Sequence, residues 1–220
     1  KFEEVGQWMR PWYFPRGNES MHDAVQRECR AVREGVGILD ASTLGKIEIQ
    51  GKDAREFLNR IYTNAWTKLE PGKCRYGLMC KDDGMVMDDG VTACLAENHF
   101  HMTTTTGGAA GVLDWMEMWH QTEWPDLEVY FNSTTDHWAA MTVTGPNARK
   151  LLAELADIDM SAEAFPYMDW REAKVAGVPA RIFRISFTGE LSYEVNVQAN
   201  YAMHVWKALF DKGAKYDLTP

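Results

Sequence analysis

The spacing of apolar residues along the first half of the chain predicts short strands that alternate with amphipathic helices. Val25, Cys29 and Val32 recur at steps of four and three residues, which is typical of one side of a helix. The expected elements are, in order, an extended lead-in at residues 8–15, a helix from Ser20 to Gly35, strands at 38–41 and 46–50, a helix from Asp53 that buries Ala54, Phe57, Leu58 and Ile61, a hairpin within 75–90, and a helix at 108–120.

A break at residues 124–126 separates this series from a second one of the same kind. The second series is expected to contain strands at 127–131 and 138–143, a helix after 145–147, strands at 181–187 and 193–197, and a helix that ends near Gly213. This alternation predicts an α+β fold of two ferredoxin-like units with antiparallel or mixed sheets and packed helices, one over residues 1–125 and one over residues 126–220. A Rossmann sheet is disfavoured, because no Gly-x-Gly-x-x-Gly loop joins a strand to a helix.

Composition narrows the class of protein and its partners. The 220 residues are 45% hydrophobic, enough to bury a core as one large domain or two small ones. A net charge of −9 without a basic cluster argues against a nucleic-acid partner. No apolar run is long enough to cross a membrane and no signal pattern opens the chain, so we expect a cytoplasmic protein with no membrane partner. The four cysteines lack a paired spacing and are expected to be reduced thiols.

The segment from Arg75 to Gly90 carries the most informative polar residues. Residues 81–84 end in Asp-Gly, which is typical of a tight hairpin turn, and the following strand contains Asp88 and Asp89. From the local sequence alone a solvated turn pair is the favoured interpretation of the two acids, since turns collect aspartate. The threonines at 103–106 follow on an expected neighbouring strand, which would bring their hydroxyls near the acids. His99 and His101 share one side of that strand, but no third ligand is recognisable and no metal is expected.

Blocks of sequence along nearly the whole chain resemble one protein family. They are Gly6-Gln7-Trp8 with Pro11, residues 36–40, residues 76–89, Thr144-Gly145-Pro146, and residues 187–190 with Glu194. Their identity and order resemble the aminomethyltransferase family, which includes the T-protein of glycine cleavage and the folate domains of dimethylglycine and sarcosine oxidases. Residues 41–46, 62–66 and 103–106 further resemble the folate domain of sarcosine oxidase α subunits.

The resemblance implies a tetrahydrofolate site that captures a one-carbon unit, with Asp89 beside the reactive nitrogens. Chemistry supports a carboxylate there, because a folate amine that attacks formaldehyde or an iminium becomes cationic and must lose a proton. A carboxylate stabilises that charge and helps to remove the proton. Asp88 is then expected to be a structural neighbour.

The same resemblance assigns six further residues to the folate pocket. Glu194 is implied to accept hydrogen bonds from the pterin ring, although an amphipathic strand alone would also explain a glutamate that faces water. Tyr76 is implied to border the ligand, and Thr103 and Thr105 to line it. Three of the positions differ from the T-protein, which has asparagine in place of Thr105, methionine in place of Leu44 and tyrosine in place of Phe187.

Three hypotheses follow from these residues. The first is an enzyme domain that forms 5,10-methylenetetrahydrofolate with the carbon released by sarcosine oxidation. The second is a folate-binding module without chemistry, and the third is a structural domain that has lost the pocket. The first implies a hetero-oligomer with other sarcosine oxidase subunits, in which FAD, FMN and NAD bind elsewhere. Relative to the family, the chain ends before a C-terminal barrel, so weak or absent folate binding is expected from these residues alone.

Overall fold

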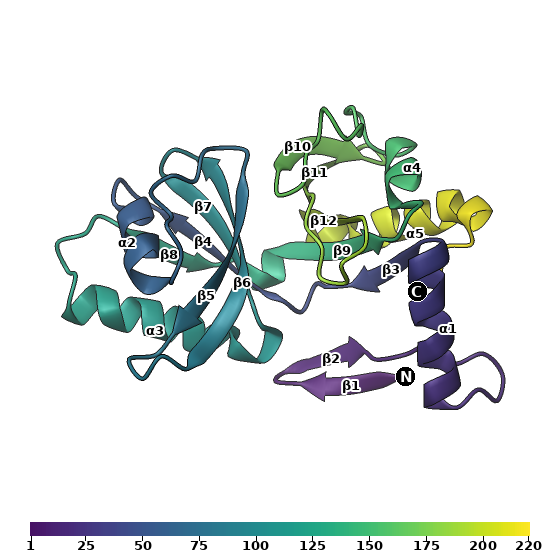
Figure 1. The fold of residues 1–220 in the computed structure, drawn as a ribbon, viewed down its shortest axis with the longest axis horizontal. Helices are drawn as coiled ribbons and strands as arrows, with labels where there is room; N and C mark the ends of the chain where they lie inside the picture. The colour runs from purple at the N-terminus through teal and green to yellow at the C-terminus, as the bar shows by residue number, and fades with distance from the viewer. The chain divides into compact units, whose positions relative to one another are not determined.

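Residues 1–220 are described by a computed structural model, in which the chain forms two compact units. Unit 1 contains Lys1–Thr43 and Asp136–Pro220, and unit 2 contains Leu44–Thr135. Figure 1 shows each unit built around its own sheet. This division differs from the sequential one predicted at residues 125 and 126, because one strand from each half of the chain joins the sheet of the other half.

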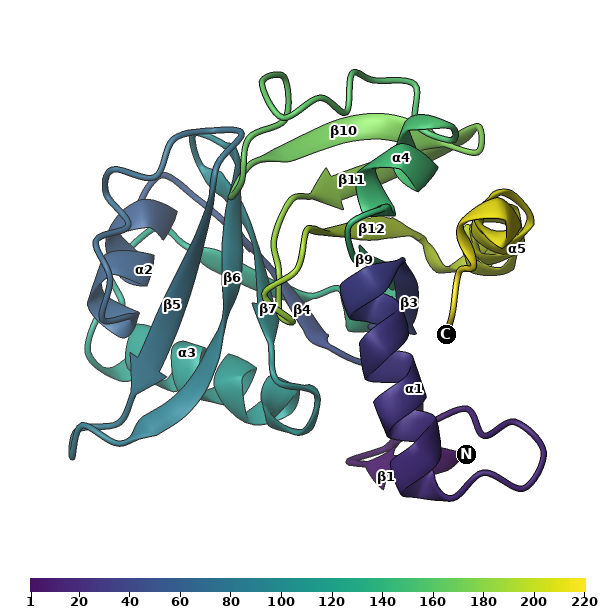
Figure 2. The ribbon, with the colours of Figure 1, turned by 45° about the vertical axis from the view of Figure 1, so that its right-hand side comes forward.

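Unit 2 is an antiparallel sheet with two helices on one face (Figure 2). Its elements are β4 (Gly45–Gln50), α2 (Ala54–Ile61), β5 (Cys74–Cys80), β6 (Val86–Ala96), β7 (His99–Thr104), the short η1 (Thr106–Gly108), α3 (Ala109–Thr122) and β8 (Tyr130–Ser133). The strand order is β5-β6-β7-β4-β8. Phe57 and Leu58 of α2 and Met116 of α3 pack with the strands in one buried cluster. The four residues that α2 was predicted to bury are all buried.

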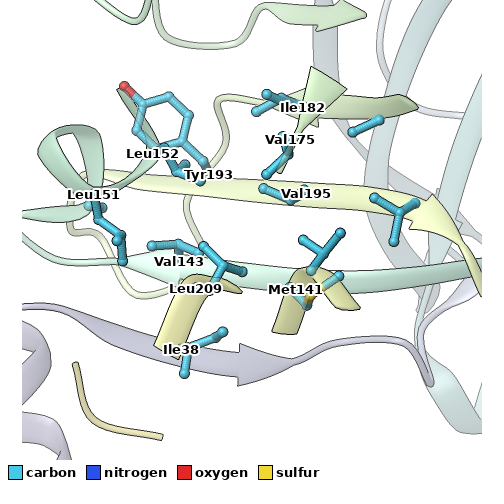
Figure 3. Packing of buried hydrophobic residues seen from close by; sticks show 14 of the residues in the cluster. Ile38, Met141, Val143, Leu151, Leu152, Val175, Ile182, Tyr193, Val195 and Leu209 are labelled. Atoms are coloured by element: carbon cyan, nitrogen blue, oxygen red, sulfur yellow. The ribbon is translucent and has the colours of Figure 1, made fainter. Parts of the chain in front are cut away.

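Unit 1 contains a second five-stranded antiparallel sheet, in the order β10-β11-β12-β9-β3. Its elements are a hairpin of β1 (Phe2–Val5) and β2 (Trp8–Pro11), then α1 (Met21–Glu34), β3 (Gly37–Asp40), β9 (Trp138–Thr144), α4 (Ala148–Ala153), β10 (Trp170–Val175), β11 (Val178–Phe183), β12 (Ser192–Gln198) and α5 (Ala202–Gly213). Figure 3 shows Leu151 and Leu152 of α4 and Leu209 of α5 packed against the strands. The core of unit 1 therefore lies between its sheet and these two helices.

The two sheets share one topology, and each takes a strand from the other half of the chain. In unit 2, β4 and α2 lead into the meander β5-β6-β7 and then α3, and β7 pairs with β4. In unit 1, β9 and α4 lead into the meander β10-β11-β12 and then α5, and β12 pairs with β9. The fifth strand is exchanged: β3 directly precedes β4 but pairs with β9, and β8 directly precedes β9 but pairs with β4. The prediction of ferredoxin-like units is therefore wrong in detail, because that motif has only two strands between its helices.

Several local predictions about the N-terminal region are confirmed and others are not. The Ser20 side chain accepts from the backbone N–H of Asp23 and the Asp23 side chain accepts from the backbone of Ser20, so the capping box is present. Only Ala24 of α1 is fully buried, whereas Val25 and Cys29 are exposed. Within the predicted lead-in at residues 8–15, Trp8–Pro11 is the extended strand β2, and it forms a hairpin with β1 that was not predicted. None of the helices has the length and apolar composition needed to cross a membrane.

Helices α2 and α4 are preceded by the same glycine turn. Gly51 and Gly145 have φ values of 131° and 123°, in the region that favours glycine. Each accepts a hydrogen bond at its carbonyl from the alanine three residues on, at 3.1 Å from Ala54 and 3.0 Å from Ala148. A Cβ at Gly51 would lie 2.1 Å from a backbone oxygen, and one at Gly145 would lie 2.6 Å from two. Glycine is therefore required at both positions.

We expect Gly51→Ala and Gly145→Ala each to destabilise the chain by about 2 kcal/mol or more, because both strain and backbone overlap result. Gly111→Ala is the matched control, since Gly111 lies within α3 and an added Cβ there meets nothing within 4 Å. That variant should be stabilised by up to about 1 kcal/mol. Urea unfolding of the 220-residue chain measures all three values, and equal stabilities for the three variants would contradict the analysis.

Candidate functional site

The hairpin of β5 and β6 positions the two adjacent acids. Lys81 donates its backbone N–H to Met85 at 2.9 Å, and Gly84 takes a φ of 80° in the turn. Asp88 and Asp89 lie within β6, where they pair with Met79 and Leu78 of β5. The solvated-turn interpretation is therefore excluded. Because consecutive side chains of a strand point to opposite faces, the two carboxylates are in different environments.

Asp89 is the exposed member of the pair, and Tyr76 is its partner. The Tyr76 hydroxyl donates to Asp89 Oδ2 at 2.8 Å. This hydrogen bond to the carboxylate raises the pKa of Tyr76 above its ordinary value. Tyr76 is itself 49% exposed, so both groups are open to a ligand in this chain. The arrangement offers a carboxylate that can stabilise a cation or accept a proton, beside an aromatic ring that can border a planar ligand.

Asp88 is buried on the opposite face of β6, with 5% of its surface exposed. Its two carboxylate oxygens lie 3.2 and 3.4 Å from the backbone nitrogen of Thr105, which donates its N–H to them. Burial raises the pKa of Asp88 above its ordinary value, and hydrogen bonds from Thr105 oppose that shift. Asp88 thus links β6 to the end of β7, consistent with the structural role expected for it.

The other predicted residues of unit 2 differ in how their polar groups are used. Thr103 Oγ1 accepts from the backbone N–H of Val91 at 3.0 Å and donates to the Val91 carbonyl at 3.1 Å, so its hydroxyl is held by β6. Thr105 is exposed, and Leu44 is partly buried just before β4. Leu44 accepts from Lys46 Nζ at its carbonyl, at 2.9 Å. Unit 2 therefore carries five of the seven predicted residues.

The remaining two predicted residues belong to unit 1. Glu194 lies on β12 between Tyr193 and Val195, which are completely buried in the core, so its side chain occupies the opposite face of the sheet. Glu194 is partly buried there rather than freely exposed. Phe187 is 94% exposed in the loop before β12. That loop is anchored by Thr188, whose hydroxyl lies 3.0 Å from the hydroxyl of Thr144.

The face of β12 that carries Glu194 contains two further polar residues that the sequence analysis missed. Ser192 and Asn196 are 3% and 1% exposed, and Ser192 Oγ and Asn196 Oδ1 have no hydrogen-bond partner. Their spacing of two residues on either side of Glu194 is the sequence signal that could have identified them. Together with Glu194 they place three polar side chains on one face of β12, two of which contain a buried oxygen without a partner.

His99 and His101, considered above as a metal pair, both contact one carboxylate. His101 Nδ1 lies 3.0 Å from Glu48 Oε1, and His99 Nε2 contacts Glu48 Oε2. No group of three or more histidine, cysteine, aspartate or glutamate side chains is arranged to hold a metal ion.

Comparison with known proteins identifies relatives along the whole chain. The chain is 56% identical over 222 residues to the sarcosine oxidase subunit alpha of Corynebacterium sp. strain U-96. The aligned region covers 100% of this chain and 23% of that protein. It is 33% identical over 218 residues to the aminomethyltransferase of Bacillus subtilis strain 168, covering 99% of this chain and 56% of that protein. The chain therefore spans about a quarter of one relative and about half of the other.

A solved structure and a family model complete the comparison. The crystal structure of glycine cleavage system aminomethyltransferase T from Bartonella henselae matches all of this chain and 55% of its own, with a TM-score of 0.83 at 21% identity, and so shares its α+β fold. The family model described as the GCVT N-terminal domain matches residues 1–220. This chain therefore belongs to the family of GCVT N-terminal domains.

Proposed function

We propose that this chain is the tetrahydrofolate-binding domain of a sarcosine oxidase α subunit and forms 5,10-methylenetetrahydrofolate from the one-carbon unit released by sarcosine oxidation. The observation that carries the proposal is the division of the acid pair, in which Asp89 is exposed beside Tyr76 while Asp88 is buried. An exposed carboxylate on a rigid strand, rather than on a loop, suits a group that must meet a reacting nitrogen.

The residues of unit 1 fit a pterin ring. The edge of the ring carries several N–H donors, and Glu194 with the unpartnered Asn196 Oδ1 supplies acceptors on one face of β12. The Ser192 hydroxyl can both donate and accept. Glu194 would bind the amino and ring N–H groups, and Phe187 would add apolar surface. Leu44, Thr103 and Thr105 of unit 2 are proposed as further residues that contact the folate.

When bound, tetrahydrofolate supplies the nucleophilic nitrogens that take up the one-carbon unit. Asp89 stabilises positive charge on the nitrogen nearest to it and accepts the proton that this nitrogen loses. Tyr76 keeps Asp89 in place through its hydrogen bond of 2.8 Å. Thr103 keeps β7 in register with β6 through its two bonds to Val91, so the lining residues stay aligned with the acid.

Sequence identity favours an oxidase subunit over a separate aminomethyltransferase. The chain is 56% identical to the Corynebacterium sarcosine oxidase subunit and 33% identical to the Bacillus aminomethyltransferase. The proposal therefore includes other sarcosine oxidase subunits as partners, and FAD, FMN and NAD bound elsewhere in a cytoplasmic complex. Product formation from sarcosine, without an aminomethyl carrier protein, distinguishes the two activities.

We expect Asp89→Asn in the full-length protein to keep the dissociation constant for tetrahydrofolate within about tenfold of the unmodified value, while methylenetetrahydrofolate formation falls by about a hundredfold or more. Asparagine keeps the size and one acceptor oxygen but cannot take up the proton. Calorimetry measures affinity, and product analysis after sarcosine oxidation measures transfer. Asp82→Asn, in the exposed turn of the same hairpin, is the control and should change neither value. Parallel loss of affinity and transfer in Asp89→Asn would contradict the assigned role.

We expect Glu194→Gln to lower the affinity for tetrahydrofolate more than it lowers product formation, which is the reverse of the result expected for Asp89→Asn. Loss of charge-assisted hydrogen bonds to the pterin ring is expected to weaken tetrahydrofolate affinity by about tenfold or more, with a smaller change in product formation at saturating ligand. Glu172→Gln on the exposed position of β10 is the matched control. Unchanged affinity in Glu194→Gln would remove Glu194 from the pocket.

A further inference from the structure

A buried polar group lies beneath the strand that carries Asp89, where a sheet core normally contains apolar residues. Asp88 faces the helix-covered side of the sheet of unit 2, together with Thr92 of the same strand. Tyr62 and Trp66 pack against Gly77 of β5 on this side, since a Cβ at Gly77 would lie 2.7 Å from Trp66 and 2.9 Å from Tyr62. Trp66 Nε1 is buried without a partner, and the hydroxyls of Tyr62 and Thr92 are buried beside each other.

Because the two units share one topology, the position of Asp88 in unit 2 can be compared with the equivalent position in unit 1. Gly51 and Gly145 align the two copies, so the pair Ile47 and Met102 corresponds to the pair Met141 and Val195. Thr92 also pairs with Met102, and Ile182 also pairs with Val195, so Thr92 of β6 corresponds to Ile182 of β11. Four residues earlier on each strand, Asp88 corresponds to Val178.

The isolated bridges of the two units confirm this correspondence. Asp88 pairs with Met79, and Val178 pairs with Val175, which gives Met79 the position of Val175. Isolated bridges then join Tyr62 to Met79 and Ala156 to Val175, which gives Tyr62 the position of Ala156. Unit 1 therefore builds this site from valine and alanine, whereas unit 2 builds it from aspartate and tyrosine.

The fold itself does not require a carboxylate at this position, since Val178 is 6% exposed in the core of unit 1. Burying a carboxylate is unfavourable unless hydrogen bonds compensate, and Asp88 accepts bonds from Thr105 and from the backbone of Asp89. Met102 of β7 corresponds to Val195 of β12, and three residues after each of them stand Thr105 and Gln198, so Gln198 is the equivalent of Thr105 in unit 1. Val178 cannot accept a hydrogen bond from the backbone of Gln198. The Asp88–Thr105 bond is therefore specific to the unit that carries Asp89.

We propose that Asp88 is a positioning residue of the folate site, which fixes the backbone of Thr105 relative to Asp89 by accepting its N–H. The bond ties β6 to the segment between β7 and α3, where Gly108 lies beside the carboxylate: a Cβ there would lie 3.4 Å from Asp88 Oδ1, in ordinary van der Waals contact. Asp88 acts through Thr105 and the strand, and not on the ligand. The ionisable groups beside it are Asp89 and Tyr62, whose pKa is raised by burial and by the charge of Asp88.

The test compares Asp88→Val, the residue of the other copy, with Asp88→Asn in the full-length protein. Asparagine retains an oxygen that can accept from Thr105, whereas valine does not. Hydrogen exchange of a short peptide that includes Thr105 should become faster in Asp88→Val and stay near the unmodified rate in Asp88→Asn. Peptides from β5 and α2 should keep their protection in both variants, which separates a local effect from unfolding.

The effect on catalysis rests on the proposed function and is measured separately. Methylenetetrahydrofolate formation is expected to fall by about tenfold or more in Asp88→Val, because small displacements of a pocket are costly to catalysis. It should stay within about threefold in Asp88→Asn. Rescue by asparagine supports positioning, whereas equal loss in both variants, or full activity in Asp88→Val, overturns it. If Asp89→Asn is fully active, the proposed function fails, yet the exchange of Thr105 still reports whether Asp88 holds it.

Discussion

The pairing of β6 with β5 is the constraint on which the candidate site depends. It places Asp89 opposite Leu78 and Asp88 opposite Met79, so that one carboxylate faces outward and its neighbour faces the core. A slip of one residue would reverse the two environments, burying the acid that bonds to Tyr76 and exposing the acid that holds Thr105. The Lys81–Gly84 turn connects β5 to β6 at one end of this pairing, and the two bonds between Thr103 and Val91 hold β7 against the other edge of β6.

The electrostatics of the two acids follow from this difference. The folded protein binds the proton of Asp88 more tightly than the unfolded chain does, because burial raises its pKa from 3.8. The protonated group therefore favours folding at low pH, and this contribution is lost as the pH rises from about 4 through the folded-state value. At neutral pH the ionised Asp88 lowers stability, which is the expected direction for a residue retained for a site rather than for the core.

The sequence predicted most elements because apolar spacing is a local property. Ala54, Phe57, Leu58 and Ile61 lie on the buried side of α2 as their spacing indicated, and Ser20 and Asp23 form the expected cap. Strand β10 was missed because its alternation is carried by the charged residues Arg171, Glu172 and Lys174. The exchange of β3 and β8 could not be predicted, because periodicity says which face a strand buries and not which strand it pairs with.

The site was predictable only where a motif carried it. Asp89, Glu194 and the lining residues came from the ordered blocks. The spacing of Ser192 and Asn196 on either side of Glu194 indicates the face that they share, whereas their burial and missing partners come from the coordinates. The role of Asp88 likewise depends on the comparison with Val178, which requires the registers of both sheets. Adjacent aspartates have the same local chemistry, and tertiary structure alone assigns them opposite environments.

The exchanged strands also determine the order in which this chain can fold as it is synthesised. All five strands of unit 2 lie within the continuous segment Leu44–Thr135, so its sheet can close as soon as β8 leaves the ribosome. Unit 1 must instead retain β3 unpaired until β9 is made, and then close a chain loop that spans all of unit 2. Such long-range closure is slow and leaves an open edge in the meantime, so unit 1 is the part of a nascent chain most exposed to misassembly.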